Sequence, residues 1–420
     1  MVRAYIAITL VTAMLLAACG GEKRAAPVVG ANCADVYYQG EGAPDVLIVS
    51  DFPRRGPLRR EVTTPMVEAI KLVLRRRDFR AGHRRVGYQS CDDSVGDDFD
   101  PAACAANAEA YVANKDVLGV IGTYNSGCAT EILPIISRRS AGPLAMISPS
   151  NTYLGLTSTG TGVCCGHPRT LYADGIRNYV RVVAPDDRQG SAGAVAAKDR
   201  GAKRAVVLVQ QTEDYAIALA ASFTRASRNT GTQVVTIPYD TRPAFAKLAR
   251  EVASHAPDVA YIAGLANANG RRLVEDLRAA LGESVILIAG DAWAGLAAEI
   301  GPAGEGMLVT HAGSPVERLS PAGASFIAAL GIPIAELQDK WVPESGQATE
   351  VLLEAIARSD GTRASVVEEI RATRVKGGLL GDFGFDAKGD IDPAFFALYR
   401  FHAGKEELAG TIVVPSELAR

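Results

Sequence analysis

Short, wholly apolar runs that alternate with helix-like segments are the feature that most constrains this fold. A strand that is apolar along its whole length is buried on both faces, as in parallel sheets. The runs are residues 46–49, 117–121, 143–147, 205–209, 234–237, 259–263, 285–289 and 307–310. The alternation of strand and helix predicts an α/β fold. Because the runs form two sets along the chain, we expect two doubly wound parallel-sheet lobes.

Apolar residues at helical spacing separate these runs. The patterns are Met66–Ile70–Val73–Leu74 after Pro65, Phe245–Leu248–Val252 after Pro243, and Leu273–Leu277–Leu281. Pro65 is suited to the first turn of its helix, where its missing N–H leaves no hydrogen bond unmade. Each pattern therefore predicts a helix that packs against the strands on either side of it.

Length and charge exclude several classes of protein. At 420 residues the chain exceeds the roughly 150 residues of an ordinary domain, which again indicates more than one domain. With 44 Lys+Arg against 47 Asp+Glu the net charge is −3, so no basic surface for nucleic acid is expected. Aromatic residues make up only 6%, which argues against base-stacking platforms.

The N-terminus resembles a bacterial lipoprotein signal. Arg3 precedes an apolar stretch, residues 4–16, that is too short to span a bilayer, and small residues then lead into Cys19. We expect residues 1–18 to be a signal peptide and Cys19 to be lipidated, which would hold the protein outside the cytoplasm by a lipid anchor only. An ordinary secretory signal with a chance cysteine is the alternative.

Residues 19–43, rich in Gly, Pro and charge, are expected to form a tether with little core content. Six further cysteines suggest disulfides in an exported chain, and six allow 15 pairings, so no pairing is predicted. They are Cys33, Cys91, Cys104, Cys128, Cys164 and Cys165. A metal site at Cys164-Cys165-Gly166-His167 lacks a second ligand pair at zinc spacing, so no metal or cofactor is expected.

Polar residues follow several predicted strands, where open α/β sheets bind ligands. Asn125 and Ser126 follow the run 117–121, and Ser126 can cap the next helix, whose free N–H groups suit a carboxylate. A plain helix cap is the alternative. The other candidates are Ser150, Thr152 and Tyr153 after the run 143–147, Tyr215 after 205–209, and Asp291 after 285–289.

At these loops the chain resembles the substrate-binding lipoproteins of branched-chain amino acid ABC transporters, which have the type I periplasmic binding fold. The similarity runs from about residue 44 to 402. The stretches that carry it are Val120–Cys128, Ile147–Tyr153, Gly304–Thr310 and Gly381–Asp390.

The resemblance implies two lobes joined by three crossovers with the ligand between them. The N-terminal lobe would be residues 44–183 and 311–391, and the C-terminal lobe 184–310 and 392–420. A monomer that binds a small molecule and delivers it to ABC permease subunits is implied, with no catalytic residues.

In this family the ligand's α-carboxylate is held by residues matching Ser126 and Thr152, and an α-ammonium by the carbonyl matching Ser150. The aromatic residue that covers the ligand matches Tyr215. The family's glutamate for the ammonium is replaced by Arg242, and Asp240 or Asp291 could substitute for it. An acid or amide without an ammonium group is the alternative ligand.

Four arginines in the loop after the first strand could also favour an anion, although an arginine-rich surface loop is the simpler interpretation. They are Arg54, Arg55, Arg59 and Arg60. The leading hypothesis is a lipid-anchored solute-binding protein. A ligand sensor that reports to a membrane receptor is the alternative. An exported hydrolase is disfavoured because no Gly-x-Ser-x-Gly or His-Glu-x-x-His pattern occurs.

Overall fold

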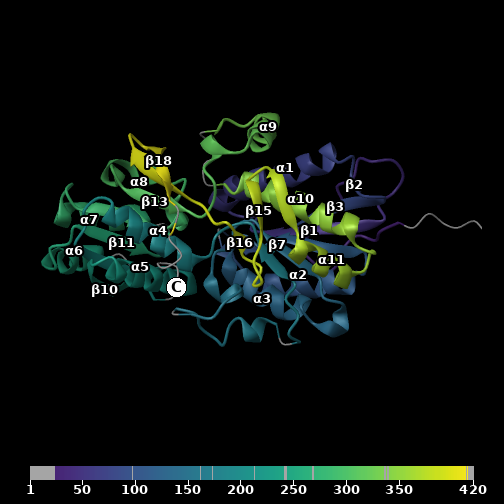
Figure 1. Ribbon diagram of the computed structural model, residues 1–420, viewed down its shortest axis with the longest axis horizontal. Helices are drawn as coiled ribbons and strands as arrows, with labels where there is room; N and C mark the ends of the chain where they lie inside the picture. Colours follow the sequence, from purple (N-terminus) through teal and green to yellow (C-terminus); the bar gives the residue numbers. More distant parts are fainter. Residues whose placement is uncertain are drawn as a thin grey trace, which may run out of the picture.

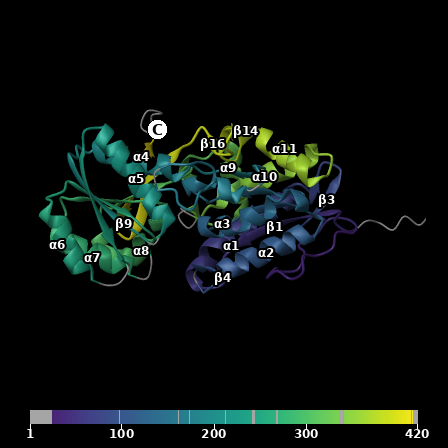
Figure 2. The ribbon, with the colours of Figure 1, turned by 90° about the horizontal axis from the view of Figure 1, so that it is seen from below.

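Two α/β lobes lie side by side in the computed structural model (Figures 1 and 2). The structure describes residues 24–96, 98–160, 162–172, 174–211, 213–240, 244–266, 269–334, 337, 340–412 and 414. The predicted signal peptide and Cys19 lie outside these residues. Among the described residues, no helix is both long and apolar enough to cross a membrane.

The first lobe is built on a six-stranded sheet in the order β2-β3-β1-β6-β7-β8, parallel except for the β2–β3 pair. Its strands are β1 (Val46–Phe52), β2 (Arg80–Ala81), β3 (Arg84–Asp92), β6 (Val117–Gly122), β7 (Ala145–Ser148) and β8 (Tyr179–Arg181). Its helices are α1 (Pro57–Arg76), α2 (Pro101–Ala113), α3 (Ser126–Ile136), α9 (Pro321–Leu330), α10 (Val342–Arg358) and α11 (Arg363–Ala372).

Alternate residues of this sheet enter two different cores. Ile48 packs with residues of α1 and α10 on one face, while Leu47 and Val49 pack with residues of α2 and α3 on the other. Helices therefore cover both faces, and this is why the strands read as continuous apolar runs.

The second lobe contains a seven-stranded sheet in the order β10-β9-β11-β12-β13-β17-β18. Its strands are β9 (Arg204–Gln210), β10 (Gln233–Tyr239), β11 (Val259–Ala263), β12 (Ile286–Ala289), β13 (Leu308–His311), β17 (Phe396–His402) and β18 (Lys405–Ile412). Its helices are α4 (Asp186–Lys198), α5 (Asp214–Asn229), α6 (Phe245–Ser254), α7 (Gly270–Leu281) and α8 (Ala297–Ile300). The pairs β13–β17 and β17–β18 are antiparallel, and the other pairs are parallel.

The chain passes between the lobes after β8, after β13 and before β17, so the two-lobe α/β fold with three crossovers is confirmed. The residue boundaries that the sequence gives for each lobe remain predictions. Two smaller sheets complete the fold: β4 (Ser94–Val95) with β5 (Asp98–Phe99), and β14 (Arg374–Gly378) with β15 (Gly381–Phe385) and β16 (Ile391–Asp392).

Pro65 does not lie in the first turn of its helix, so that prediction is wrong. Helix α1 begins at Pro57, eight residues earlier, and contains Pro65 in its interior. Pro57 takes the early position where a missing N–H is harmless. The apolar pattern alone detected only the C-terminal half of α1, whose residues enter the core.

The described part of the expected tether packs against the first lobe. Ala25 and Val28 are buried, and the Gln89 side chain on β3 accepts from the Val28 N–H at 2.7 Å. Cys33 bridges to β3 through a disulfide with Cys91. This segment therefore supplies core contacts in addition to any tethering role.

The remaining cysteines pair locally. Cys104 of α2 is bonded to Cys128 of α3, and Cys164 to its neighbour Cys165. Asp93 lies close to Cys104 and Cys128, but the sulfurs of these two cysteines are bonded to each other and so are not free to bind a metal ion. The Cys104–Cys128 pair fixes the N-terminal part of α3 to α2, and α3 begins at a predicted site residue.

Asp51 is a buried carboxyl at the end of β1. Tyr111 Oη donates to it at 2.8 Å, and Asn107 Nδ2 donates at 3.1 Å. Burial raises the pKa of Asp51 to about 7, although both hydrogen bonds act in the opposite direction. Because the folded pKa exceeds the ordinary 3.8, the folded chain retains a proton that the unfolded chain loses between these two values.

We therefore expect the Asp51 contribution to stability to be complete below pH 3.8 and to be lost as the pH rises to about 7. Asp51→Asn should make the decline of unfolding free energy over this range shallower than in the natural protein. Urea unfolding at a series of pH values measures this. Asp35→Asn, at an exposed site, is the control, and an unchanged slope in Asp51→Asn would contradict the assignment.

Candidate functional site

The predicted site begins where β6 enters α3. Asn125, rather than Ser126, occupies the cap position, and no side chain caps this helix, so the predicted role of Ser126 as the cap is corrected. The Ser126 Oγ instead accepts a hydrogen bond from the Tyr153 N–H at 3.3 Å. The first-turn N–H groups of α3 therefore have no side-chain cap, which leaves this helix end suited to an anion.

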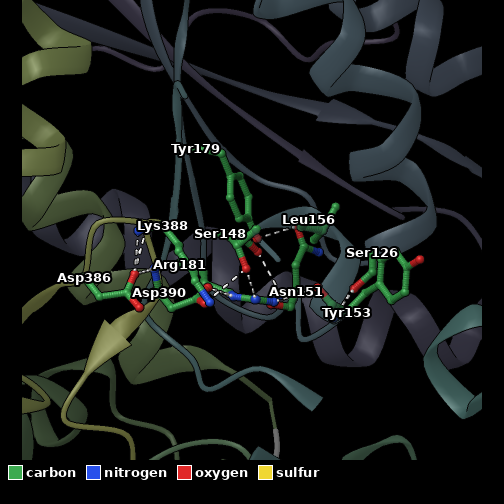
Figure 3. Close-up of polar contacts among 12 residues, drawn as sticks. Ser126, Ser148, Asn151, Tyr153, Leu156, Tyr179, Arg181, Asp386, Lys388 and Asp390 are labelled. Carbon is green, nitrogen blue, oxygen red and sulfur yellow. Dashed lines mark hydrogen bonds and ion pairs between the residues drawn. The ribbon is translucent and has the colours of Figure 1, made fainter. Parts of the chain in front are cut away.

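Hydrogen bonds hold the loop after β7 against the loop after β6 (Figure 3). Ser148 Oγ accepts from the N–H of Asn151 at 2.9 Å and donates to the Thr123 carbonyl at 3.1 Å. Asn151 Nδ2 donates to the carbonyls of Thr123 and Tyr124, at 2.9 and 3.0 Å. These buried bonds bring Ser150, Thr152 and Tyr153 beside Ser126, as the sequence predicts for two adjacent strand ends.

Arg181 supports this loop from the side on which Asp390 lies (Figure 3). Its side chain is fully buried, and its Nε donates to Asp390 Oδ1 at 2.7 Å. Its Nη1 donates to the carbonyls of Asn151 and Tyr153, at 3.1 and 2.9 Å. The loop that carries Thr152 is thus held on both sides of that residue by one guanidinium group.

A tight turn presents Asp390 to Arg181. The Asp386 carboxylate accepts from the N–H groups of Lys388, Gly389 and Asp390 at 2.8 to 3.0 Å (Figure 3). Gly389 has φ +101°, and a Cβ there would lie 2.4 Å from the Tyr179 carbonyl oxygen. Only glycine fits this position, which explains the Asp-x-x-Gly-Asp pattern at the end of the Gly381–Asp390 stretch.

The second lobe contributes Tyr215 and Asp291. Tyr215 lies in the first turn of α5, and its hydroxyl donates to Asp291 Oδ1 at 2.7 Å. A Cβ at Gly290 would lie 2.3 Å from the Tyr215 oxygen, so glycine before Asp291 makes room for the phenol. Loss of solvent raises the pKa of Asp291, and the Tyr215 hydrogen bond acts in the opposite direction.

Asp186 is a further residue of this region that the sequence did not single out. It opens α4, and its N–H donates to the Thr152 carbonyl at 2.8 Å. The residue is fully buried, and a hydrogen bond from the Thr152 side chain lowers the pKa of its carboxyl group, against the effect of burial. Burial, and secondarily Asp291, raise the pKa of Asp186 well above its ordinary value.

Asp186 could not be singled out from the sequence because an acidic residue in the first turn of a helix is usually explained by its favourable interaction with the helix dipole. Such residues are ordinarily solvated. The signal would have been its position directly after the crossover from β8, where the first lobe meets the second.

Not every predicted residue joins this group. Asp240 is exposed at the end of the edge strand β10, and Arg242 lies outside the described residues. Arg55 forms an ion pair with Asp92 at 2.9 Å and is 60% exposed, which favours a surface role. The side chains of Arg59 and Arg60 lie outside the described part of the chain.

Two surface hollows of the first lobe involve none of the predicted binding residues. One, of about 510 Å³, includes Tyr38 and Arg75, and the other, of about 660 Å³, includes Arg177 and Arg371. Ser126, Ser150, Thr152 and Tyr153 instead lie on the two adjoining loops after β6 and β7.

Comparison with known proteins adds independent findings. Residues 52–394 match the family described as periplasmic binding protein. A search of curated proteins finds no match.

Among solved structures, a leucine-binding protein of Thermotoga maritima is 25% identical, covers 87% of this chain and 98% of its own, and has a TM-score of 0.73. An isoleucine complex of a branched-chain amino acid binding protein of Streptococcus pneumoniae is 18% identical, covers 87% and 99%, and scores 0.71. A solute-binding protein of R. palustris in complex with 4-hydroxybenzoate is 17% identical, covers 88% and 98%, and scores 0.72.

The Arg181–Asp390 pair gives a stability prediction. Removing one partner of a buried ion pair costs about 3–5 kcal/mol, because the other charge stays buried without compensation. Asp390→Asn should therefore lower the unfolding free energy by about that amount in urea titrations followed by circular dichroism.

The control is Glu407→Gln, which breaks a pair with Arg400 whose side chains are 52% and 48% exposed. This variant should cost less than about 1 kcal/mol. Equal losses in the two variants would contradict a supporting role for the buried pair.

Proposed function

The chain belongs to the periplasmic binding protein family, and from this premise we propose that it captures a small carboxylate-bearing ligand, an amino acid or a close relative, between its lobes. Proteins of this family are solute-binding components of ABC transporters and are not enzymes. The chain is accordingly an extracytoplasmic solute-binding protein. The ligand and its position are what we propose here.

The observation that carries the proposal is the contact between Thr152 and Asp186. The Asp186 N–H donates to the Thr152 carbonyl at 2.8 Å, and this joins the loop after β7 to the first helix of the second lobe. Ser126 is linked to the same loop through the Tyr153 N–H. This contact supports a ligand position between the lobes, where groups of both lobes could reach it.

The first-lobe side of this place suits a carboxylate. Ser126 stands at the start of α3, whose N–H groups carry the positive end of the helix dipole. Thr152 lies on the neighbouring loop and is nearly buried, with 4% of the residue exposed. The Ser150 hydroxyl already donates to the carbonyls of Thr123 and Tyr124, so Ser150 would offer a ligand only its own carbonyl. Buried hydroxyl and N–H donors hold an anion well because they replace the water that it loses.

The solved relatives agree in one chemical respect. The ligands in the complexes with isoleucine and with 4-hydroxybenzoate both carry a carboxylate, and only the first also carries an ammonium group. A carboxylate site in the first lobe would serve either kind of ligand. The charge that the second lobe presents to the ligand would then decide between an amino acid and a simple carboxylic acid.

The same proposal includes a membrane anchor, a permease partner and a closing motion of the lobes. Lipidation of Cys19 would attach the chain to the outer face of the bacterial membrane, and a monomer would meet the ABC permease subunits. Lobes joined by three passages can close by hinge motion around a ligand. Tyr215, at the start of α5, would cover the ligand on closure.

Replacing both hydroxyls, in Ser126→Ala with Thr152→Ala, should remove most of the ligand-induced thermal stabilisation. A ligand present at 100 times its dissociation constant stabilises the natural protein by about 2.7 kcal/mol, which gives a clear shift. The measurement is a thermal-shift screen of the soluble chain against amino acids, their amides and aromatic carboxylates.

The control is Thr349→Ala with Ser359→Ala. Both hydroxyls are buried and donate to backbone carbonyls of α10, at 2.7 and 2.8 Å, away from the proposed site. This pair tests for a general loss of stability. Full ligand response in the Ser126/Thr152 variant would refute the proposed site.

A further inference from the structure

The disulfide between Cys164 and Cys165 joins two neighbouring residues of one loop. The other two disulfides of the described residues span 58 and 24 positions of the sequence. A disulfide stabilises a fold mainly by closing a loop of the unfolded chain, and it does so more for a longer loop. A bond between neighbours closes almost no loop, so we expect its effect to be local.

The backbone at this disulfide is held in an unusual conformation. Cys165 has φ +61°, which a residue with a side chain rarely adopts, and Gly166 follows with φ +74°. The ring that the bond closes restrains both cysteines. Opening the bond would therefore allow Cys165 to return to a negative φ, and this would redirect the chain on either side of it.

The two cysteines differ in their access to solvent. Cys165 is exposed and Cys164 is half-buried, whereas Cys104 and Cys128 of the α2–α3 disulfide are both fully buried. A thiol must reach a sulfur atom to open a disulfide, and exposed disulfides are the more readily reduced ones. The bond between Cys164 and Cys165 is therefore a selective target for a reductant.

The Tyr153 hydroxyl links this disulfide to the candidate site. It accepts from the Cys164 N–H at 3.1 Å and donates to the Cys164 Sγ at 3.8 Å. The Tyr153 N–H donates to Ser126 Oγ at 3.3 Å, and the Tyr153 carbonyl accepts from Arg181 Nη1 at 2.9 Å. A rearrangement at Cys164 would therefore act on the residue next to Thr152.

The Cys164 loop, which we define as residues 162–172, also contacts the second lobe. Gly162 lies so close to α5 that a Cβ there would stand 2.6 Å from the Ala218 Cα. Ala218 is buried in the same apolar cluster as Tyr153. Tyr215 lies about one turn before Ala218 on α5. The loop therefore holds the part of α5 that carries the residue proposed to cover the ligand.

We propose that the Cys164–Cys165 disulfide is a thiol–disulfide exchange site, and that its reduction by a dithiol releases the Cys164 loop from α5. The disulfide is the resting form, because extracytoplasmic conditions are oxidising. Weaker ligand binding is the expected consequence, and this consequence alone rests on the proposed function.

The exchange has two steps. A thiolate of the dithiol attacks Cys165 Sγ and forms a mixed disulfide, while the electron pair of the broken bond passes to Cys164 Sγ, which then takes up a proton. The Tyr153 hydroxyl, which already donates to this sulfur, would stabilise the leaving thiolate.

The second thiolate of the dithiol then attacks the reductant's sulfur in the mixed disulfide. This step releases the Cys165 thiolate, which is protonated, and leaves the reductant as a cyclic disulfide. In total, two electrons and two protons pass from the dithiol to the protein.

The first test measures selectivity of reduction in the folded protein. Dithiothreitol is added without denaturant, free thiols are alkylated at timed intervals, and peptides are identified by mass spectrometry. Cys164 and Cys165 should be alkylated at least about tenfold faster than the other four disulfide cysteines. Equal rates at all three disulfides would overturn the exchange site.

The second test measures release of the loop and needs no ligand. Hydrogen exchange followed by mass spectrometry compares the oxidised protein with protein reduced only at Cys164 and Cys165. Reduction should speed exchange in residues 162–172 and in the first turns of α5. Unchanged exchange in both segments would overturn the inference. Cys164→Ser with Cys165→Ser should resemble the reduced protein and should not respond to dithiothreitol.

A matched pair of glycine variants tests the contact with α5. Gly162 and Gly175 have φ +85° and +72°, so alanine strains the backbone at both. Only Gly162 faces α5, since a Cβ at Gly175 would meet no described atom within 4 Å. Gly162→Ala should give oxidised protein the fast α5 exchange of the reduced form, and Gly175→Ala should not. Equal behaviour of the two variants would contradict the contact.

Calorimetry with leucine tests the consequence for binding. Reduction should weaken leucine binding by about fivefold or more, the lower end of ordinary coupling between two sites. Unchanged affinity would show that the released loop does not act on the site, and would overturn this consequence. Failure of the oxidised protein to bind any carboxylate would refute the proposed function, while the reduction and exchange measurements would still decide the inference.

Discussion

The buried pair of Arg181 and Asp390 is the interaction on which the site depends. One guanidinium group bonds the Asp390 carboxylate at 2.7 Å and also the carbonyls of Asn151 and Tyr153. A buried charge persists only when its hydrogen bonds are satisfied, so this arrangement tolerates little displacement. The pair joins segments more than 200 residues apart in sequence and fixes the loop that bears Thr152.

The two lobes perform different parts of one task. The first lobe presents hydroxyls and a helix N-terminus, which favour a negative group. The second would cover the ligand with Tyr215, at the start of α5. A ligand that contacts both lobes would stabilise the closed arrangement because each of its ends interacts with a different lobe. Ligand binding would then shift the population of the protein toward the closed arrangement.

The sequence predicted the frame of the fold well because parallel strands buried on both faces are apolar along their length. It also predicted that the loops of Ser126 and Thr152 would meet, since adjacent parallel strands end at one edge. It missed the start of α1 at Pro57 and the packing of Val28 and Cys33, since neither shows periodicity. It missed Asp186 because burial of an acidic residue is a property of the tertiary contact with Thr152, not of local pattern.

The most direct test of the account is a crystal structure of the soluble chain with the amino acid that gives the largest thermal shift. We expect ligand density between the lobes, with the carboxylate at Ser126 and Thr152. Density in a surface hollow of the first lobe, such as the one that includes Arg177 and Arg371, would contradict it.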